Sequence, residues 1–257
     1  MKKHIPNLFT LLNLLSGMVA VIMAASDRMV FAAGFVFLGI FFDFFDGFFA
    51  RKFNVQGEFG KQLDSLADMV TSGVVPGIVM FQMILFASKQ IWFTELSCET
   101  GNWSSFHETM YYYLPFIGFL IPLASAYRLA NFNIDERQSD SFIGMPTPAF
   151  SIFVLSLPLI LVYAEGSFLA NWIQNPYVLI GITLIGSYLL NAEIALFSLK
   201  FKNYGFKGNE VKYVFIFLSA LMLFTFQIVA IPLIIVLYIL MSLFENKRLK
   251  KRPSVDS

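Results

Sequence analysis

Residues 43–68 read DFFDGFFARKFNVQGEFGKQLDSLAD and lie between two of the most apolar segments of the chain. Asp43 and Asp46 are three residues apart, whereas Asp64 and Asp68 are four residues apart. On a helix, either spacing places both side chains on the same face. We therefore expect two helices, joined by a short polar connection, that each present a pair of carboxylates.

Carboxylates at such positions indicate a cation site. Acidic side chains in membrane segments are costly, and they usually line a cavity, form a pair or bind a cation. Converging carboxylates repel one another unless cations lie among them. Hard divalent cations such as Mg²⁺ take oxygen ligands of this kind together with substrate phosphates. The pattern predicts a Mg²⁺ or Mn²⁺ site formed by Asp43, Asp46, Asp64 and Asp68.

The neighbouring residues suit phosphate chemistry. Gly47 allows a ligand to approach the backbone closely, and the small Ala50 leaves room on the same face. Arg51 offers a planar guanidinium that can bind a phosphate oxygen. A polar loop with chance charges would leave this fixed spacing unexplained.

At these residues the chain resembles the CDP-alcohol phosphotransferases. Their motif, D-x-x-D-G-x-x-A-R followed after eight residues by G-x-x-x-D-x-x-x-D, is matched at every defining position. The resemblance implies an enzyme that displaces CMP from a CDP-linked donor with an alcohol. It also implies two metal ions and a homodimer. The matching positions are Asp43, Asp46, Gly47, Ala50, Arg51, Gly60, Asp64 and Asp68.

Composition indicates a membrane protein. The chain has 257 residues, of which 57% are hydrophobic and 14% are charged, whereas soluble domains are nearer a quarter charged. The net charge of +1 gives no reason to expect a nucleic-acid partner, and the single Cys98 excludes an internal disulfide.

We predict an all-α, polytopic integral membrane bundle of about eight transmembrane helices, forming one domain over residues 1–257 with a basic, disordered tail from about residue 246. The apolar stretch 213–244 exceeds the roughly 20 residues of one span, so we divide it near Gln227. Residues 51–59 form the polar connection. The other expected spans are residues 8–25, 29–49, 60–86, 111–132, 147–163 and 177–199.

The distribution of basic residues predicts the orientation. With eight spans and a cytoplasmic N-terminus, sixteen of the eighteen Lys and Arg residues face the cytoplasm, and only Arg28 and Lys89 do not. This asymmetry follows the positive-inside rule. We expect a multi-pass protein of the cytoplasmic membrane, in contact with membrane lipids, with both termini and the aspartate site on the cytoplasmic side.

The N-terminal sequence Pro6-Asn7-x-x-Thr10 precedes the first span. Asn7 can cap that helix, but in proteins similar to this one the same pattern contributes to nucleotide binding. With the motif residues, the resemblance implies a binding site for CDP-diacylglycerol. Its residues are Pro6, Asn7, Thr10, Asp46, Gly47, Ala50, Arg51 and Gly60.

The end of the fourth span suggests the acceptor alcohol. Residues 128–133 read RLANFN, and residues 144–149 read GMPTPA. They resemble stretches of the membrane-embedded phosphatidylserine synthases of this family, except that Asn131 replaces an arginine. The resemblance implies that CDP-diacylglycerol and L-serine react to give phosphatidylserine and CMP. Arg128, Asn131 and Asn133 would bind serine, and Asp68 would accept the hydroxyl proton as general base.

Two other functions fit parts of the pattern. Glycerol 3-phosphate or inositol phosphate could serve as acceptor, but each carries a phosphate and should require more basic residues than Arg128 and Arg137 near the site. A cation transporter would explain buried carboxylates, but it leaves Gly47 and Arg51 unexplained. Glu193, expected within the sixth span, is either a functional acid or part of a polar helix contact.

The predicted orientation can be tested by cysteine labelling. In a Cys98→Ser background, the Asn54→Cys variant should react with a membrane-impermeant maleimide only from the cytoplasmic side. Native Cys98 should react only from the opposite side, because a single expected span, residues 60–86, separates the two loops. Labelling of both cysteines from one side would contradict the topology.

Overall fold

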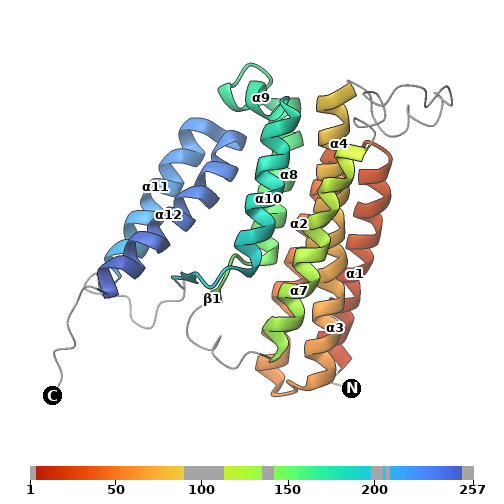
Figure 1. Cartoon of the computed structure of the whole chain (residues 1–257). Coiled ribbons are helices and arrows are strands. Elements are labelled where there is room, and N and C mark those ends of the chain that lie inside the picture. Colours follow the sequence, from red (N-terminus) through yellow and green to blue (C-terminus); the bar gives the residue numbers. More distant parts are fainter. Residues whose placement is uncertain (1–3, 90–112, 135–141, 198–204, 206–208, 251–257) are drawn as a thin grey trace.

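The computed structural model describes residues 4–89, 113–134, 142–197, 205 and 209–250, and most of these are helical (Figure 1). The elements are α1 (His4–Ala25), α2 (Met29–Phe53), α3 (Glu58–Asp68), π-helix η1 (Met69–Val74), α4 (Val75–Lys89), 3₁₀-helix η2 (Leu114–Phe119), α7 (Leu120–Ile134), β1 (Phe142–Ile143), α8 (Thr147–Tyr163), α9 (Phe168–Ile173), α10 (Pro176–Asn191), β2 (Ala195–Leu196), α11 (Glu210–Phe226), 3₁₀-helix η4 (Gln227–Val229) and α12 (Ala230–Lys250).

Helices α1 and α2 form a tight antiparallel pair (Figure 1). Asp27 adopts a left-handed conformation, with φ of 60°, and reverses the chain between them. Small residues occupy the contact: Ala20, Ala24 and Ala32 are completely buried. Small side chains let helix backbones approach closely inside a membrane, so the helix that carries Asp43 and Asp46 lies directly against the N-terminal helix.

Residues 58–89 form one continuous helical rod, in which α3, η1 and α4 follow one another. In its most apolar stretch 72% of the residues are buried, against 33% for α1 and for α2. The rod is therefore the central helix of the bundle. It carries Asp64 and Asp68 into the interior, where they meet side chains from α1 and α2.

Two glycines bring α4 and the following helical segment into backbone contact. A Cβ atom on Gly118 of η2 would lie 2.7 Å from the backbone nitrogen of Phe81, and one on Gly77 would lie 2.5 Å from Cδ of Pro122. Neither position has room for a side chain. This close approach keeps α7, which carries the predicted serine-binding residues, against the central rod.

Helices α8 and α10 continue the bundle, and a short antiparallel pair of strands lies where α8 begins and α10 ends. In this pair Phe142 lies opposite Leu196, and Ile143 lies opposite Ala195. Gly144 follows β1 with φ of 75°, and a Cβ there would lie 2.6 Å from the carbonyl oxygen of Leu190. The strands thus join the start of α8 to the end of α10.

Helices α11 and α12 form a hairpin at the edge of the bundle, where α12 packs on α8 (Figure 1). The predicted break near Gln227 is confirmed: this residue has φ of 50°, and η4 separates the two helices. Helix α12 continues to Lys250, past the expected start of the tail near residue 246. The rest of the expected tail lies outside the described residues.

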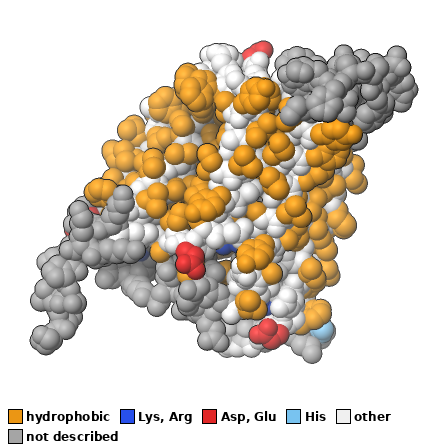
Figure 2. Space-filling model, viewed as in Figure 1, with side chains coloured by type: hydrophobic (Ala, Val, Ile, Leu, Met, Phe, Trp, Pro, Cys, Tyr) orange, Lys and Arg blue, Asp and Glu red, His pale blue; other side chains and the backbone are white. Residues whose placement is uncertain are grey.

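The all-α membrane class is confirmed. Four described helical stretches are long and apolar enough to cross a membrane, namely His4–Ala25, Met29–Phe53, Glu58–Ser88 and Glu210–Asn246. Helices α8 and α10 are apolar but shorter. Hydrophobic side chains cover much of the visible surface (Figure 2). The total of about eight crossings stays a prediction.

Two expected boundaries are wrong. Helix α2 continues through Phe53 instead of ending at residue 49, so Arg51 and Lys52 belong to a helix rather than to the connection. Helix α10 ends at Asn191, and Glu193 lies exposed between α10 and β2 instead of inside a span. In both cases a run of apolar residues did not reveal where the backbone hydrogen bonds of the helix end.

Candidate active site

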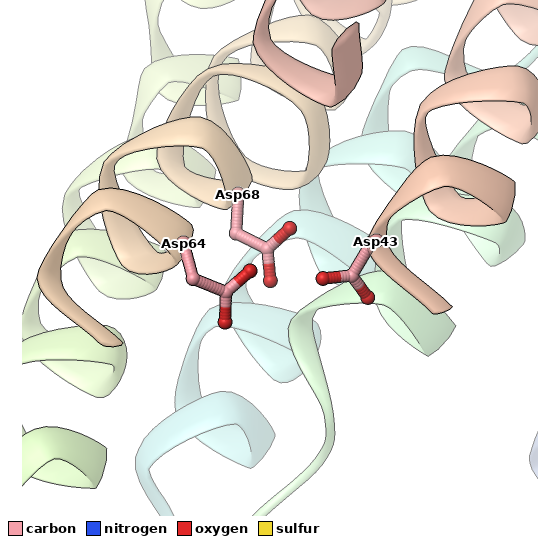
Figure 3. A group of neighbouring side chains, drawn as sticks. All are labelled: Asp43, Asp64 and Asp68. Atoms are coloured by element: carbon pink, nitrogen blue, oxygen red, sulfur yellow. The ribbon is translucent and has the colours of Figure 1, made fainter. Parts of the chain in front are cut away.

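Three aspartates from two helices converge near one end of the bundle. Asp43 lies on α2, while Asp64 and Asp68 lie one turn apart on α3. Figure 3 shows the three carboxylates pointing toward one another across the gap between the helices. One oxygen from each lies within 4.8 Å of the others. The predicted spacing along each helix therefore places these side chains in one cluster.

The cluster fits a divalent cation. Oδ1 of Asp64 is buried and has no hydrogen-bond partner. Two ionised carboxylates at this separation repel each other by roughly 3 kcal/mol at an effective dielectric constant of about 20. A hard cation would relieve this repulsion and would accept the oxygen ligands that the three side chains offer. Asp43, Asp64 and Asp68 can thus hold a metal ion.

Asp46 lies beside the cluster and outside the group of three. It is on the same face of α2 as Asp43, and only 7% of its surface is exposed. The hydroxyl of Thr10, on α1, donates a hydrogen bond to Oδ2 of Asp46 at 2.6 Å. One oxygen of Asp46 is therefore held by α1, and the carboxylate faces the neighbouring cavity.

A cavity of about 530 Å³ adjoins the cluster, between the start of α1, the end of α2 and the start of α3. All eight residues predicted to bind the CDP-linked donor line it, together with Asp64 and Lys61. Residues that are far apart in the chain, such as Pro6 and Gly60, thus line the same cavity. The cavity combines carboxylates with the cationic side chains of Arg51 and Lys61.

Arg51 reaches this cavity because α2 is longer than expected. It lies one turn beyond Gly47, and a Cβ atom on Gly47 would stand 3.4 Å from Nη1 of Arg51. Helix α2 then ends at Asn54, which adopts a left-handed conformation with φ of 52°. The chain turns at once into α3, so the two aspartate-bearing helices stay side by side.

The residues predicted to bind serine lie on α7, and none of them lines the cavity. Nδ2 of Asn133 donates to Oγ of Ser65 at 2.9 Å, and Nζ of Lys61 donates to the carbonyl oxygen of Asn133. These bonds hold the end of α7 against α3, next to Asp64. Asn131 is half-buried.

Arg128 is buried and interacts with backbone carbonyls. Its Nη1 donates to the carbonyl oxygen of Ile143 at 3.1 Å and lies 3.5 Å from that of Leu190. A charged donor here satisfies carbonyls at the strand pair and at the end of α10, where no helical partner is available. Arg128 therefore has a structural contact that the sequence did not predict.

Two polar residues of the site were missed in the sequence. Nδ2 of Asn13, on α1, donates to Oδ1 of Asp68 at 3.1 Å, and Lys61 lines the cavity. A signal for Asn13 was available: it is a polar residue within a membrane span, three positions after Thr10 and on the same helix face. Lys61 had no comparable signal, because a lysine near a helix start is ordinary.

The family follows from both site and sequence. The model of the CDP-alcohol phosphatidyltransferase family matches residues 3–190, which is more than half of the chain. The chain belongs to this family, and it is a transferase. Its helices α1–α3 carry the family motif, and the cavity described above lies between them.

Several named relatives are similar to part of this chain. The CDP-diacylglycerol–serine O-phosphatidyltransferase of Bacillus subtilis is 34% identical over 149 residues, covering 56% of this chain and 70% of the relative. That of Helicobacter pylori is 32% identical over 152 residues, covering 58% and 55%. The archaetidylserine synthase of Methanothermobacter thermautotrophicus is 28% identical over 166 residues, covering 63% and 61%.

The similarity spans little more than half the length of the second and third of these relatives. The family match ends at residue 190, so α11 and α12 lie beyond it.

The cluster predicts a specific pattern of metal binding. We expect each of three substitutions to remove a direct metal ligand: Asp43→Asn, Asp64→Asn and Asp68→Asn. Loss of a residue that only hydrogen-bonds to a ligand weakens metal binding by roughly 10- to 100-fold, so each of these variants should weaken Mn²⁺ binding by more than that. Mn²⁺ titration followed by electron paramagnetic resonance measures this on purified protein. Glu165→Gln, an exposed acid in the loop before α9, is the control and should bind Mn²⁺ like the parent. Equal affinity in all four variants would contradict a metal site at the cluster.

Proposed function

We propose that the protein transfers the phosphatidyl group of CDP-diacylglycerol to the hydroxyl of L-serine and releases CMP. The observation that carries this proposal is the cavity next to the three-aspartate cluster, lined by all eight residues predicted to bind the donor. Membership of the family supports the transfer reaction. The names of the relatives from Bacillus subtilis and Helicobacter pylori support serine as the acceptor.

The reaction forms and breaks one bond at the same phosphorus. The hydroxyl oxygen of serine attacks the phosphorus that carries diacylglycerol. The bond from this phosphorus to the oxygen shared with the cytidylyl phosphate breaks, and CMP leaves with that oxygen. Asp68 accepts the hydroxyl proton as general base, since its carboxylate belongs to the cluster that adjoins the donor cavity.

The cavity residues have complementary roles toward the donor. Arg51 binds the diphosphate, and its planar guanidinium fits phosphate oxygens. Gly47, Ala50 and Gly60 leave space for the nucleotide, while Pro6, Asn7 and Thr10 border it from α1. The apolar surfaces of α1 and α2 allow the lipid chains of the donor to stay in the bilayer.

Asp43, Asp46, Asp64 and Asp68 would hold two Mg²⁺ or Mn²⁺ ions. When bound, the ions supply positive charge that neutralises the phosphoryl oxygens and stabilises departing CMP. The close approach of Asp43, Asp64 and Asp68, and the unpartnered oxygen of Asp64, support this assignment.

Arg128, Asn131 and Asn133 would bind serine from α7. Asn133 touches α3 next to Asp64, so a small amino acid at the end of α7 can reach the cluster. Nη1 of Arg128 is directed at the carbonyl oxygens of Ile143 and Leu190, so the other N–H groups of its guanidinium would bind the carboxylate of serine. Asn133 would accept a hydrogen bond from the ammonium group through its amide oxygen.

The architecture of the assembled enzyme is also part of the proposal. The chain would form a single membrane-embedded domain with the cavity and both termini on the cytoplasmic side, where L-serine is available. The excess of basic residues on that side supports the orientation. The family resemblance supports a homodimer.

The proposal is tested by CMP release from purified protein in detergent micelles that contain CDP-diacylglycerol and Mg²⁺ or Mn²⁺. L-Serine should release CMP faster than glycerol 3-phosphate or inositol phosphate, and Asp64→Asn should release almost none. Faster release with a phosphorylated acceptor would contradict serine specificity. No release with any of the alcohols would contradict the reaction itself.

Gly47→Ala tests whether the cavity binds the donor. The added Cβ would meet only the Arg51 side chain, at ordinary contact distance, so the fold should tolerate it while the space for the nucleotide shrinks. We expect the KM for CDP-diacylglycerol to rise by roughly 10- to 100-fold, because overpacking commonly costs about 1–3 kcal/mol. Gly34→Ala is the matched control on the same helix, where a Cβ meets nothing within 4 Å. Similar KM values for both variants would contradict the assignment.

Asn131→Ala is the cleanest test of the serine site, since removal of Arg128 would also leave buried carbonyls without a partner. Loss of a hydrogen bond to a charged group costs about 1.5–3 kcal/mol, so the KM for serine should rise by roughly tenfold to over a hundredfold. The KM for CDP-diacylglycerol should stay unchanged. Tyr127→Phe, which removes a hydroxyl from an exposed side chain of the same helix, is the control. An unchanged KM for serine in Asn131→Ala would exclude Asn131 from the site.

A further inference from the structure

A buried polar contact connects the cluster to the N-terminal helix, and the motif does not include it. Asn13 of α1 and Thr71 of η1 are both completely buried. Nδ2 of Asn13 donates to Oδ1 of Asp68 at 3.1 Å, and Oγ1 of Thr71 donates to Oδ1 of Asn13 at 2.8 Å. The Thr71 hydroxyl also lies 3.2 Å from the backbone carbonyl oxygen of Asn13, so the contact with the amide oxygen is the shorter of the two. The three side chains form a directed chain from Thr71 through Asn13 to Asp68.

The chemistry of each group fixes the direction of this chain. A carboxylate only accepts hydrogen bonds, so Asn13 must turn its NH₂ group toward Asp68. Its amide oxygen then needs a donor, and the Thr71 hydroxyl provides one. If the amide were reversed, its oxygen would face the carboxylate oxygen of Asp68, and two acceptors would repel each other. Thr71 therefore holds the amide of Asn13 in the orientation in which its NH₂ group donates to Asp68.

The packing around Asn13 and Thr71 leaves them little freedom. A Cβ atom on Gly39 of α2 would lie 2.8 Å from Oδ1 of Asn13 and 2.7 Å from Cγ2 of Thr71. A Cβ on Gly17 of α1 would lie 2.4 Å from Oγ1 of Thr71. Because Gly17 and Gly39 have no side chains, α1, α2 and η1 can pack closely around Asn13 and Thr71. The hydrogen bond between these two residues is therefore surrounded by all three helices.

The backbone supports the same arrangement. Asp68 is the last residue of α3, and Thr71 lies in the π-helix η1 that follows directly. A π-helical turn is rare and is frequently found at functional sites. Here the turn begins directly after Asp68 and contains Thr71, whose hydroxyl orients Asn13.

We propose that Asn13 is a positioning residue for Asp68, and that Thr71 acts through Asn13 by orienting its amide. This inference rests on the proposed function of Asp68. By engaging Oδ1, Asn13 restrains the rotation of the Asp68 carboxylate, which belongs to the cluster. Neither residue touches the cavity. Their loss should therefore lower kcat and weaken metal binding without changing how the substrates bind.

The test compares variants that remove or keep the contact. Thr71→Val removes the hydroxyl at nearly constant volume, and Asn13→Ala removes the amide. Both should lower kcat and Mn²⁺ affinity by roughly 10- to 100-fold, as loss of an outer-shell partner does, while the KM values for CDP-diacylglycerol and serine change by less than about twofold. Thr71→Ser keeps the hydroxyl and should recover most of the kcat lost in Thr71→Val.

Thr183→Val is the matched control. Thr183 is also completely buried, and its hydroxyl donates to the carbonyl oxygen of Leu179 within α10, away from the cluster. This variant should keep the parental kcat and Mn²⁺ affinity, whatever its effect on thermal unfolding. If Thr71→Val lowers kcat no more than Thr183→Val does, or if Thr71→Ser is as impaired as Thr71→Val, the inference is wrong.

Mn²⁺ affinity, measured by electron paramagnetic resonance, separates this inference from the proposed function. If the parent binds Mn²⁺ but releases no CMP with any alcohol, the proposed reaction fails, and the affinities of Thr71→Val and Thr71→Ser still test the positioning role. If both variants bind Mn²⁺ as the parent does while CMP release depends on L-serine, the proposed function holds and the positioning role is overturned.

Discussion

Mutual repulsion of carboxylates inside an apolar bundle is the constraint on which the other features of this structure depend. Asp43, Asp64 and Asp68 bring oxygens within 4.8 Å of one another, and Asp46 is nearly buried beside them. Such a cluster is stable only if donors and cations surround it. The N-terminal helix supplies two of the donors, since Thr10 binds Asp46 and Asn13 binds Asp68.

Close helix packing makes these donors available. Helix α1 can reach the aspartates only because small residues line its contact with α2 and η1, with Gly17 and Gly39 at the crossing point. Close packing at glycines also keeps α7 against the central rod, at Gly77 and Gly118. In a membrane, where apolar surface gains little from leaving lipid, packing of this kind is a main source of helix association. The placement of the aspartates and their hydrogen-bond donors thus depends on small residues that take no part in the chemistry.

The position of the cavity suits a reaction between a lipid and a soluble molecule. It lies at the start of α1, the end of α2 and the start of α3, so a polar headgroup can reach the aspartates while acyl chains remain along the apolar helices. Lys61 connects the two halves of the proposed site, because it lines the cavity and donates to the carbonyl of Asn133 on α7. Asn133, one of the proposed acceptor residues, is therefore hydrogen-bonded to the helix that carries Asp64 and Asp68.

The sequence by itself determined the helical membrane class, the break near Gln227 and the pairing of aspartates along each helix, because these follow from local apolar runs and from helical periodicity. The family resemblance also named eight of the residues that line the cavity. Only the tertiary structure decided that Asn13 and Thr71, 58 positions apart, support Asp68, that Arg128 binds carbonyls of β1 and α10, and that Glu193 lies outside a helix. Periodicity gives the face on which a side chain lies, but its partner depends on how separate helices cross and on where each helix ends.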